Sequence, residues 1–166
     1  MKSVLISIQP KYCELIANGK KTIEVRKSRP KIETPFKCYI YCTIGNGVKG
    51  DYLVPSNIQC GKVIGDFVCD KIEELHEYEL SPSKKFYEFE KSRLDLFLKE
   101  SCLSYNEVCD YRKNLPYYKP LYGWHISDLK IYDKPKELGN FFTPMGKRPS
   151  YMIERPPKSW CYVEEI

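Results

Sequence analysis

Gly19–Lys31 reads GKKTIEVRKSRPK, and this stretch indicates both a local structure and a charged site. Basic residues fill six of its thirteen positions, whereas Glu24 is its one acid. The residues from Thr22 to Arg26 alternate between polar and apolar types, which predicts a strand with two different faces. Glu24 and Arg26 then share the polar face, and Lys21 lies just before the strand. A carboxylate held between cations on a rigid element predicts either polyanion binding or acid–base chemistry.

Short strands surround this segment in the sequence. A helix that Pro10 opens and Gly19 ends comes directly before it. Apolar runs, most of them alternating, predict the other strands over 2–8, 38–42, 61–72, 121–126, 129–132 and 160–163. Gly65, in the middle of the longest run, allows a bend or a bulge. Strands therefore dominate both ends of the chain.

The middle of the chain changes to a helical periodicity. One helix is predicted over 81–100, and the capping-box pattern Ser104-x-x-Glu107 predicts a second helix that runs to about residue 113. Short strands with turn signals and few βαβ units indicate an α+β fold, a small, mixed, largely antiparallel β-barrel of about five to six strands with inserted helices. We expect residues 1–166 to form a single domain with a helical insertion at about 81–113.

The composition is that of a folded protein. It is 42% hydrophobic and 30% charged, which excludes disorder, and the net charge of +5 favours an anionic partner. No apolar run approaches the ~20 residues that cross a bilayer, and no signal peptide is visible, so we expect a cytoplasmic protein with no membrane partner. The eight cysteines form no C-x-x-C pair and there are only two histidines. Reduced thiols are therefore expected, with no metal site and no cofactor.

Two sets of residues are candidates for contacting a nucleic acid. Four basic residues run from the strand into the following loop: Arg26, Lys27, Arg29 and Lys31. They suit phosphate contacts, although an ordinary solvated charge run has the same pattern. Tyr39 and Tyr41 alternate with core residues on the next strand, where they either stack on bases or cover the barrel surface.

The spacing Gly19-x-Lys21-x-x-Glu24-x-Arg26, after a strand and a short helix, resembles the signature of the ASCH domain family. Weaker similarity continues through 61–67, 103–107 and 121–126, so that the resemblance spans most of the chain. It implies a PUA-like β-barrel, related to RNA-binding PUA modules, with a cleft between the barrel and the helices. Many members of the family are proposed to bind RNA there.

The resemblance also implies an enzymatic alternative. Some small bacterial members hydrolyse the acetyl group of N4-acetylcytidine with a lysine, a threonine and a glutamate, and a ribonuclease activity is also known in the family. The lysine falls on Lys21, the threonine falls on Glu24, and the glutamate falls near Glu100 or, in another register, Ser101. Because Glu24 has no hydroxyl group, the threonine mechanism does not transfer. The tail Arg155–Trp160 resembles phage and prophage members.

Two hypotheses follow from the sequence. The first is a module that binds RNA, or a nucleotide-like ligand, in a basic cleft. Its contacts are expected from Lys20, Lys21, Glu24, Arg26, Lys27, Arg29, Lys31, Tyr39 and Tyr41. The second is a metal-independent hydrolase of a modified nucleoside, such as an acetylcytidine-type amide, or of RNA phosphodiesters. In it Lys21 and Glu24 form the acid–base pair, and Glu100 is a third member, although a structural ion pair in which Arg26 helps to neutralise Glu24 has the same pattern.

Overall fold

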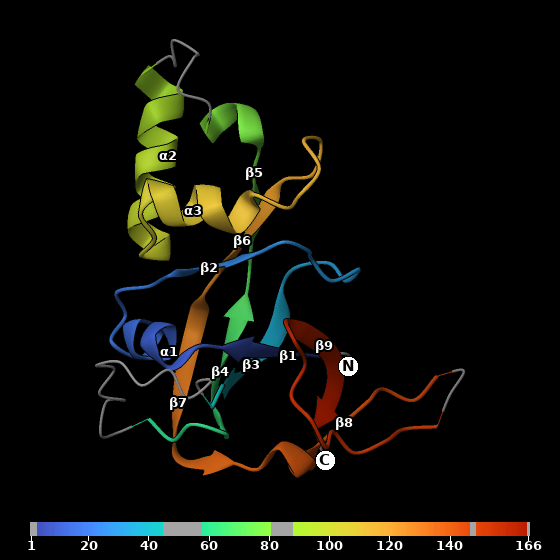
Figure 1. Ribbon diagram of the computed structural model, residues 1–166. Helices are drawn as coiled ribbons and strands as arrows, with labels where there is room; N and C mark the ends of the chain where they lie inside the picture. Colours follow the sequence, from blue (N-terminus) through green and yellow to red (C-terminus); the bar gives the residue numbers. More distant parts are fainter. Residues whose placement is uncertain (1–2, 45–57, 81–87, 147–148, 166) are drawn as a thin grey trace.

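A computed structural model describes residues 3–44, 58–80, 88–146 and 149–165 of the chain (Figure 1). Its larger sheet has six strands in the order β7-β4-β3-β1-β9-β8 and curls into a half-barrel. These strands are β1 (Ser3–Ile8), β3 (Phe36–Cys42), β4 (Val63–Cys69), β7 (Ser127–Lys136), β8 (Phe141–Phe142) and β9 (Trp160–Glu165). The β1–β3 pair is parallel, while the other neighbouring pairs are antiparallel.

A smaller antiparallel sheet has the order β2-β6-β5. Its strands are β2 (Ile23–Arg26), β6 (Leu121–His125) and β5 (Ile72–Leu75). Short connections link the two sheets, because the chain passes from β4 to β5 through Asp70 and Lys71, and from β6 to β7 through Ile126. The strand predicted over 61–72 is therefore two strands, and the α+β prediction of a small, largely antiparallel barrel with helices is confirmed. That residues 1–166 form one domain, with an insertion at about 81–113, stays a prediction.

Three α-helices and two short 3₁₀ helices accompany these sheets in the described residues. They are α1 (Pro10–Ala17), α2 (Glu88–Ser101), α3 (Tyr105–Arg112) and the 3₁₀ helices Glu77–Leu80 and Leu138–Asn140. Proline opens α1 as predicted, and Gly19 follows its end with φ +69°, a conformation that glycine adopts without strain. The predicted capping box opens α3. The predicted first turns of α2, over residues 81–87, lie outside the described residues.

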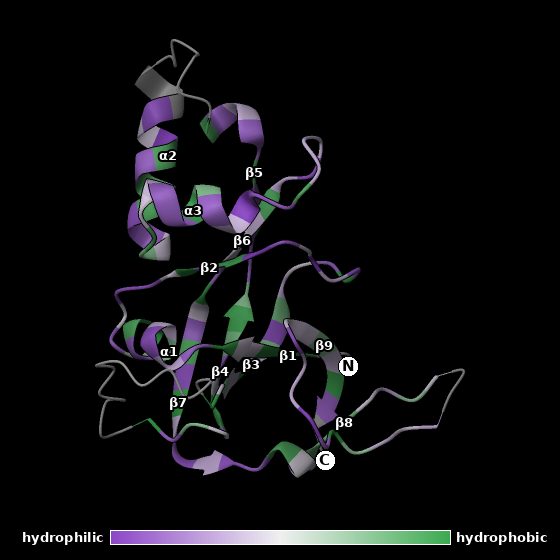
Figure 2. Ribbon diagram, viewed as in Figure 1, coloured by the Kyte–Doolittle hydropathy of each residue, from purple (hydrophilic) through white to green (hydrophobic). Residues whose placement is uncertain are grey.

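The strand β1 is buried on both faces. Val4, Ile6 and Ile8 belong to the main core inside the curl of the sheet, whereas Leu5 packs into a second cluster with Phe141. Figure 2 shows the hydrophobic colouring of the central strands and the mostly hydrophilic colouring of the outer helices. Four cysteines also lie in the main core, namely Cys13, Cys38, Cys42 and Cys69. They act there as small hydrophobic residues, and burial raises the pKa of the Cys69 thiol to about 12.

Strand β2 separates an apolar layer from a charged layer. Its Ile23 and Val25 side chains join a third core cluster with Phe97 of α2 and Val108 of α3. The alternation predicted for this strand then directs the other side chains toward the barrel and α1. Figure 1 shows β2 running between α1 on one side and α2 and α3 on the other. The strand is therefore the boundary between the barrel and the helices.

Candidate functional site

Three charged side chains of the segment Gly19–Lys31 are buried together. Lys21, Glu24 and Arg26 are only 2%, 6% and 8% exposed. Lys21 Nζ lies 3.4 Å from Glu24 Oε2, and Arg26 Nη2 lies 2.9 Å from Glu24 Oε1. One carboxylate thus holds two cations in the interior, and we call these residues the charged triad. Charged side chains are buried in this way only when they are paired.

Backbone carbonyl groups from distant segments complete the surroundings of the triad. Lys21 Nζ donates a hydrogen bond of 2.6 Å to the carbonyl of Ser101, at the end of α2. Arg26 Nη2 donates one of 2.6 Å to the carbonyl of Ser7 in β1. The backbone of β2 is tied to α2 as well, because the Thr22 amide donates to the Glu100 carbonyl at 2.8 Å. The triad is therefore anchored to both the barrel and the helices.

Two polar atoms of the triad have no hydrogen-bond partner. Glu24 Oε2 lies near Lys21 Nζ without the geometry of a hydrogen bond, and Arg26 Nε is also unpartnered. Only four buried side-chain atoms of the described residues are unpartnered, and two of them lie here. A buried donor or acceptor without a hydrogen bond costs about 1–3 kcal/mol, although the ion pair with Lys21 offsets part of this cost at Glu24 Oε2, so the two atoms need an explanation.

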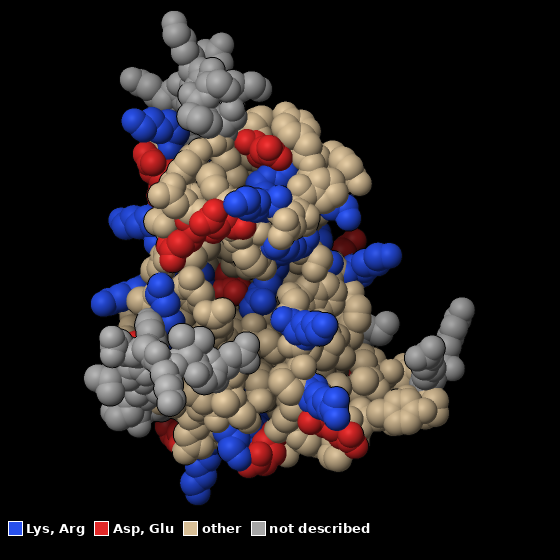
Figure 3. Space-filling model, in the orientation of Figure 1, with Lys and Arg blue, Asp and Glu red and all other residues tan. Residues whose placement is uncertain are grey.

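A hollow bordered by α1 and α3 lies at the level of the triad. Figure 3 shows this central hollow, with acidic and basic atoms at its floor. The α1 side contributes Tyr12, whose ring centroid lies 5.0 Å from Lys21 Nζ. The α3 side contributes Tyr111, whose ring centroid lies 4.7 Å from Lys27 Nζ. Burial raises the pKa of Tyr111, and the charges of Arg26 and Glu24 act on it in opposite directions.

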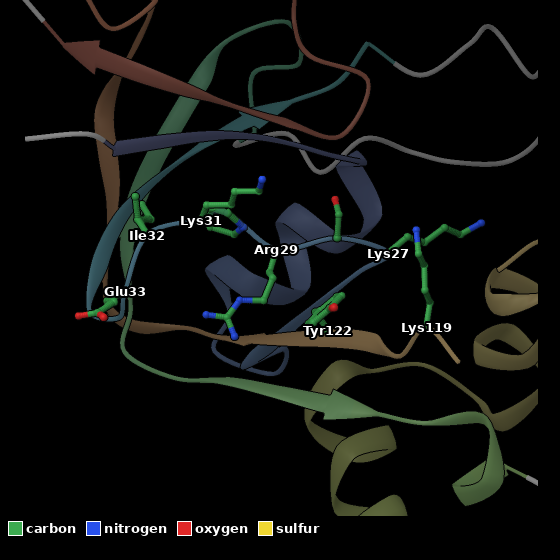
Figure 4. A pocket seen from close by; sticks show the side chains of 9 residues that line it. Lys27, Arg29, Lys31, Ile32, Glu33, Lys119 and Tyr122 are labelled. Carbon is green, nitrogen blue, oxygen red and sulfur yellow. The ribbon is translucent and has the colours of Figure 1, made fainter. Parts of the chain in front are cut away.

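A shallow basic depression of about 450 Å³ lies beside this hollow (Figure 4). Its lining residues are Lys27, Ser28, Arg29, Pro30, Lys31, Ile32, Glu33, Lys119 and Tyr122. Strand β9 holds the loop that forms most of it. Trp160 Nε1 donates to Ser28 Oγ at 3.0 Å, and the Lys31 amide donates to the Tyr162 hydroxyl at 2.6 Å. Three of the four cations, Lys27, Arg29 and Lys31, therefore lie on a loop that β9 holds in place.

Comparison with known proteins identifies the family. The sequence model of the ASCH domain matches residues 6–135, which is more than half of the chain. The chain belongs to the ASCH domain family. No curated protein matches it. The similarity of the tail Arg155–Trp160 to phage and prophage members is not tested by these findings and stays a prediction.

Solved structures support the ASCH fold. An ASCH protein from Zymomonas mobilis, solved as a tyrosine-to-phenylalanine mutant, is 20% identical with a TM-score of 0.62, and the match covers 99% of this chain and 91% of that one. The Zymomonas mobilis ASCH structure without a stated mutation is 18% identical with a TM-score of 0.56, over 98% and 87% of the two chains. Its serine-to-alanine mutant gives the same identity and score, over 98% and 88%. At these identities the likeness concerns the fold.

The structure of this ASCH domain brings together some of the predicted site residues and separates others. Lys21, Glu24 and Arg26 converge as expected, and the three basic residues that follow them line the depression. Lys20 is exposed and is not among the lining residues. In the described part of the chain Lys21 forms an ion pair with Glu24 and none with Glu100, so Ser101 is the residue of α2 that meets Lys21.

The position predicted for Tyr39 and Tyr41 requires a correction. Both are buried, at 4% and 5% exposure, in the second core cluster around Phe141. Because the face of β3 that carries them is covered, neither ring offers a surface to a base. Strand alternation alone does not reveal this, since the same pattern fits a barrel surface in contact with solvent.

The structure adds Tyr111 and Lys119 to the ASCH site, and sequence reasoning missed both. Tyr111 approaches the triad from α3, and Lys119 reaches the basic depression from the loop before β6. Each lies more than 80 residues from the triad in the chain. The only signal in the sequence was the run Tyr117–Lys119 between two prolines, which indicated a loop and nothing about its neighbours.

The capping box of α3 supports the wall of the central hollow. We expect Ser104→Ala to lower the free energy of unfolding by about 1 kcal/mol at neutral pH. Hydrogen bonds from the backbone and then the side chain of Ser104 lower the pKa of Glu107, so this contribution is complete above the ordinary carboxyl pKa and is lost as the pH falls through the lowered pKa. Urea unfolding at several pH values measures it. The neighbouring Asn106→Ala is the control, and equal losses in the two variants would contradict the prediction.

Within residues 3–44, 58–80, 88–146 and 149–165, no helix is long and apolar enough to cross a membrane. The same ranges contain no group of three or more His, Cys, Asp or Glu side chains arranged to hold a metal ion.

Proposed function

We propose that this ASCH domain binds RNA, with one nucleotide in the central hollow over the charged triad. The observation that carries the proposal is a pair of buried atoms without hydrogen bonds, Glu24 Oε2 and Arg26 Nε, which belong to residues only 6% and 8% exposed. An acceptor and a donor in one cluster fit a ligand that offers a donor beside an acceptor. The adjoining basic depression supports a phosphate-bearing ligand over a neutral one.

The chemistry of a nucleobase matches this pair of atoms. The Watson–Crick edges of cytosine and adenine each present an amino group next to a ring nitrogen. Glu24 Oε2 accepts from the amino group, while Arg26 Nε donates to the ring nitrogen. Base edges are available for such contacts in single-stranded RNA, where the bases are unpaired. The exposed cations of the depression then contact the phosphates on either side.

Binding is expected to depend strongly on salt. Four cations line the depression: Lys27, Arg29, Lys31 and Lys119. Four phosphate contacts predict a slope of about −3 in a plot of log affinity against log salt concentration. We expect the exposed pair Arg29→Ala and Lys31→Ala to reduce this slope by roughly half. Fluorescence anisotropy with a labelled single-stranded oligoribonucleotide measures it.

Matched variants make this measurement specific. The pair Lys130→Ala and Lys134→Ala removes the same charge from exposed positions of β7 outside the depression, and we expect it to leave most of the slope intact. The pair Lys21→Ala and Arg26→Ala removes both cations of the triad and is expected to abolish specific binding. No binding by the wild-type protein at low salt, or no effect of the triad substitutions in a folded variant, would refute the proposal.

A hydrolase is the second candidate function. The specific observation in its favour is the ammonium–carboxylate distance of 3.4 Å between Lys21 and Glu24, two groups that could exchange a proton with a substrate in the hollow. The proposed substrates are an acetylcytidine-type amide and an RNA phosphodiester. Incubation of the protein with N4-acetylcytidine and with short RNA, in EDTA, distinguishes the candidates. Product that disappears in Glu24→Gln supports hydrolysis, and binding without product leaves the RNA-binding proposal alone.

A further inference from the structure

We infer that the loop between α3 and β6 is a stacking arm for the single-stranded RNA that continues out of the central hollow. This inference rests on the proposed function and extends it from one nucleotide to a neighbouring stretch. We call the loop, residues 113–120, the tyrosine arm. Its Tyr117 and Tyr118 are 68% and 75% exposed, which makes them the two most exposed aromatic side chains among the described residues.

A buried arginine holds the tyrosine arm in place. Arg112, at the end of α3, is only 4% exposed. Its guanidinium donates to the carbonyls of Pro116 at 3.3 Å, Tyr117 at 2.9 Å and Lys119. It also donates to Glu77 Oε2 at 3.0 Å. One buried side chain thus binds three carbonyl groups of a single loop, which orders the backbone that displays the two rings.

An ordered loop with exposed rings is suited to binding. Burying a guanidinium group has a desolvation cost that good hydrogen bonds must offset. For Arg112 most of these hydrogen bonds go to carbonyl groups of the loop, so they also fix its backbone. Rings presented on a fixed backbone lose little conformational entropy when a ligand stacks on them, so the binding of that ligand is strengthened. Tyrosine offers a flat face to any base, and stacking of this kind tolerates different sequences.

The tyrosine arm is continuous with the basic depression. Lys119 directly follows Tyr118 in the chain and lines the depression together with Lys27 and Arg29 (Figure 4). Single-stranded RNA has two parts that this surface can bind. Its bases stack on the exposed rings, and its phosphates contact the clustered cations. A duplex would hide the base faces, so the arrangement favours unpaired RNA over double-stranded RNA.

The test uses the full chain and an eight-nucleotide single-stranded RNA that contains 2-aminopurine, a base whose fluorescence falls when it stacks. We expect the pair Tyr117→Ala and Tyr118→Ala to weaken binding by about 10-fold or more and to remove the quenching. The pair Tyr117→Phe and Tyr118→Phe keeps the rings and is expected to retain both. Tyr151→Ala, at another exposed tyrosine, is the matched control and is expected to bind as the wild type does.

The outcomes separate this inference from the proposed function. If the alanine pair binds and quenches like the wild type while Arg26→Ala weakens binding, the stacking arm is wrong and the proposed function stands. If the wild type binds no RNA at low salt, both are wrong. If the wild type forms a dimer that the alanine pair abolishes, with RNA affinity unchanged, the rings serve self-association and the inference is overturned.

Discussion

Replacing Glu24 with alanine is expected to lower the free energy of unfolding by about 3–5 kcal/mol at pH 7. Glu24 holds Lys21 at 3.4 Å and Arg26 at 2.9 Å, and both cations are almost fully buried. Without the carboxylate these cations repel each other in an environment that water hardly reaches. Urea unfolding followed by circular dichroism measures the loss. Glu33→Ala, which removes an exposed acid from the basic depression, is the control and is expected to change the free energy by less than about 0.5 kcal/mol.

The triad can also be replaced as a whole, which separates stability from function. A protein with Lys21→Met, Glu24→Leu and Arg26→Met keeps the volume of the three side chains without their charge. Such replacements of buried ion pairs are often neutral or stabilising by about 1–4 kcal/mol. We expect this variant to remain folded and to lose RNA binding completely. A loss below about 1 kcal/mol in Glu24→Ala would contradict the interpretation, because it would mean that water already screens the triad.

Replacing Trp124 with alanine is expected to cost about 3–5 kcal/mol of the free energy of unfolding. Trp124 is fully buried in the main core, with ring centroids of Phe36 and Trp160 at 5.8 and 5.9 Å. It lies directly opposite Glu24 in the register of β2 and β6, so its side chain is on the same face of the sheet as the triad. The substitution therefore opens a cavity next to the site.

Thermal and urea unfolding measure this second effect. Trp124→Phe is the matched variant, because it keeps an aromatic ring and removes the buried indole Nε1, which has no hydrogen-bond partner. We expect it to lose clearly less stability than Trp124→Ala. Similar losses in the two variants would show that the shape of the indole matters more than the filled volume. RNA affinity should also fall in Trp124→Ala, because the face that holds Glu24 loses its support.

Much of the fold could be predicted from local patterns. The alternation in β2 predicted a charged face with Glu24 and Arg26, and Gly19 predicted the end of α1 through its freedom at positive φ. The capping box at Ser104 predicted the start of α3 correctly. These predictions succeed because each depends on steric and hydrogen-bonding rules that act over a few neighbouring residues.

The failures concern residues whose surroundings come from distant segments. Tyr39 and Tyr41 have a pattern that fits both a surface and a core, and the covering of β3 by the cluster around Phe141 decides between them. For the residue of α2 beside Lys21 the sequence left both Glu100 and Ser101 open, and in the structure the carbonyl of Ser101 lies there. Sequence spacing could not settle this choice, because the contact is made by a backbone carbonyl whose position depends on where α2 ends.

The sequence by itself determined that Glu24 and Arg26 share one face of a short strand between a helix and a basic loop, with Lys21 just before that strand. Only the tertiary structure decided that these charges are buried, because the barrel, α1 and the end of α2 must meet around β2 to exclude water. It also decided that Lys119 and the tyrosine arm adjoin the same surface. The alternation of side chains along a strand depends only on neighbouring residues, so the sequence shows it. The burial of a side chain depends on which distant segments pack around it.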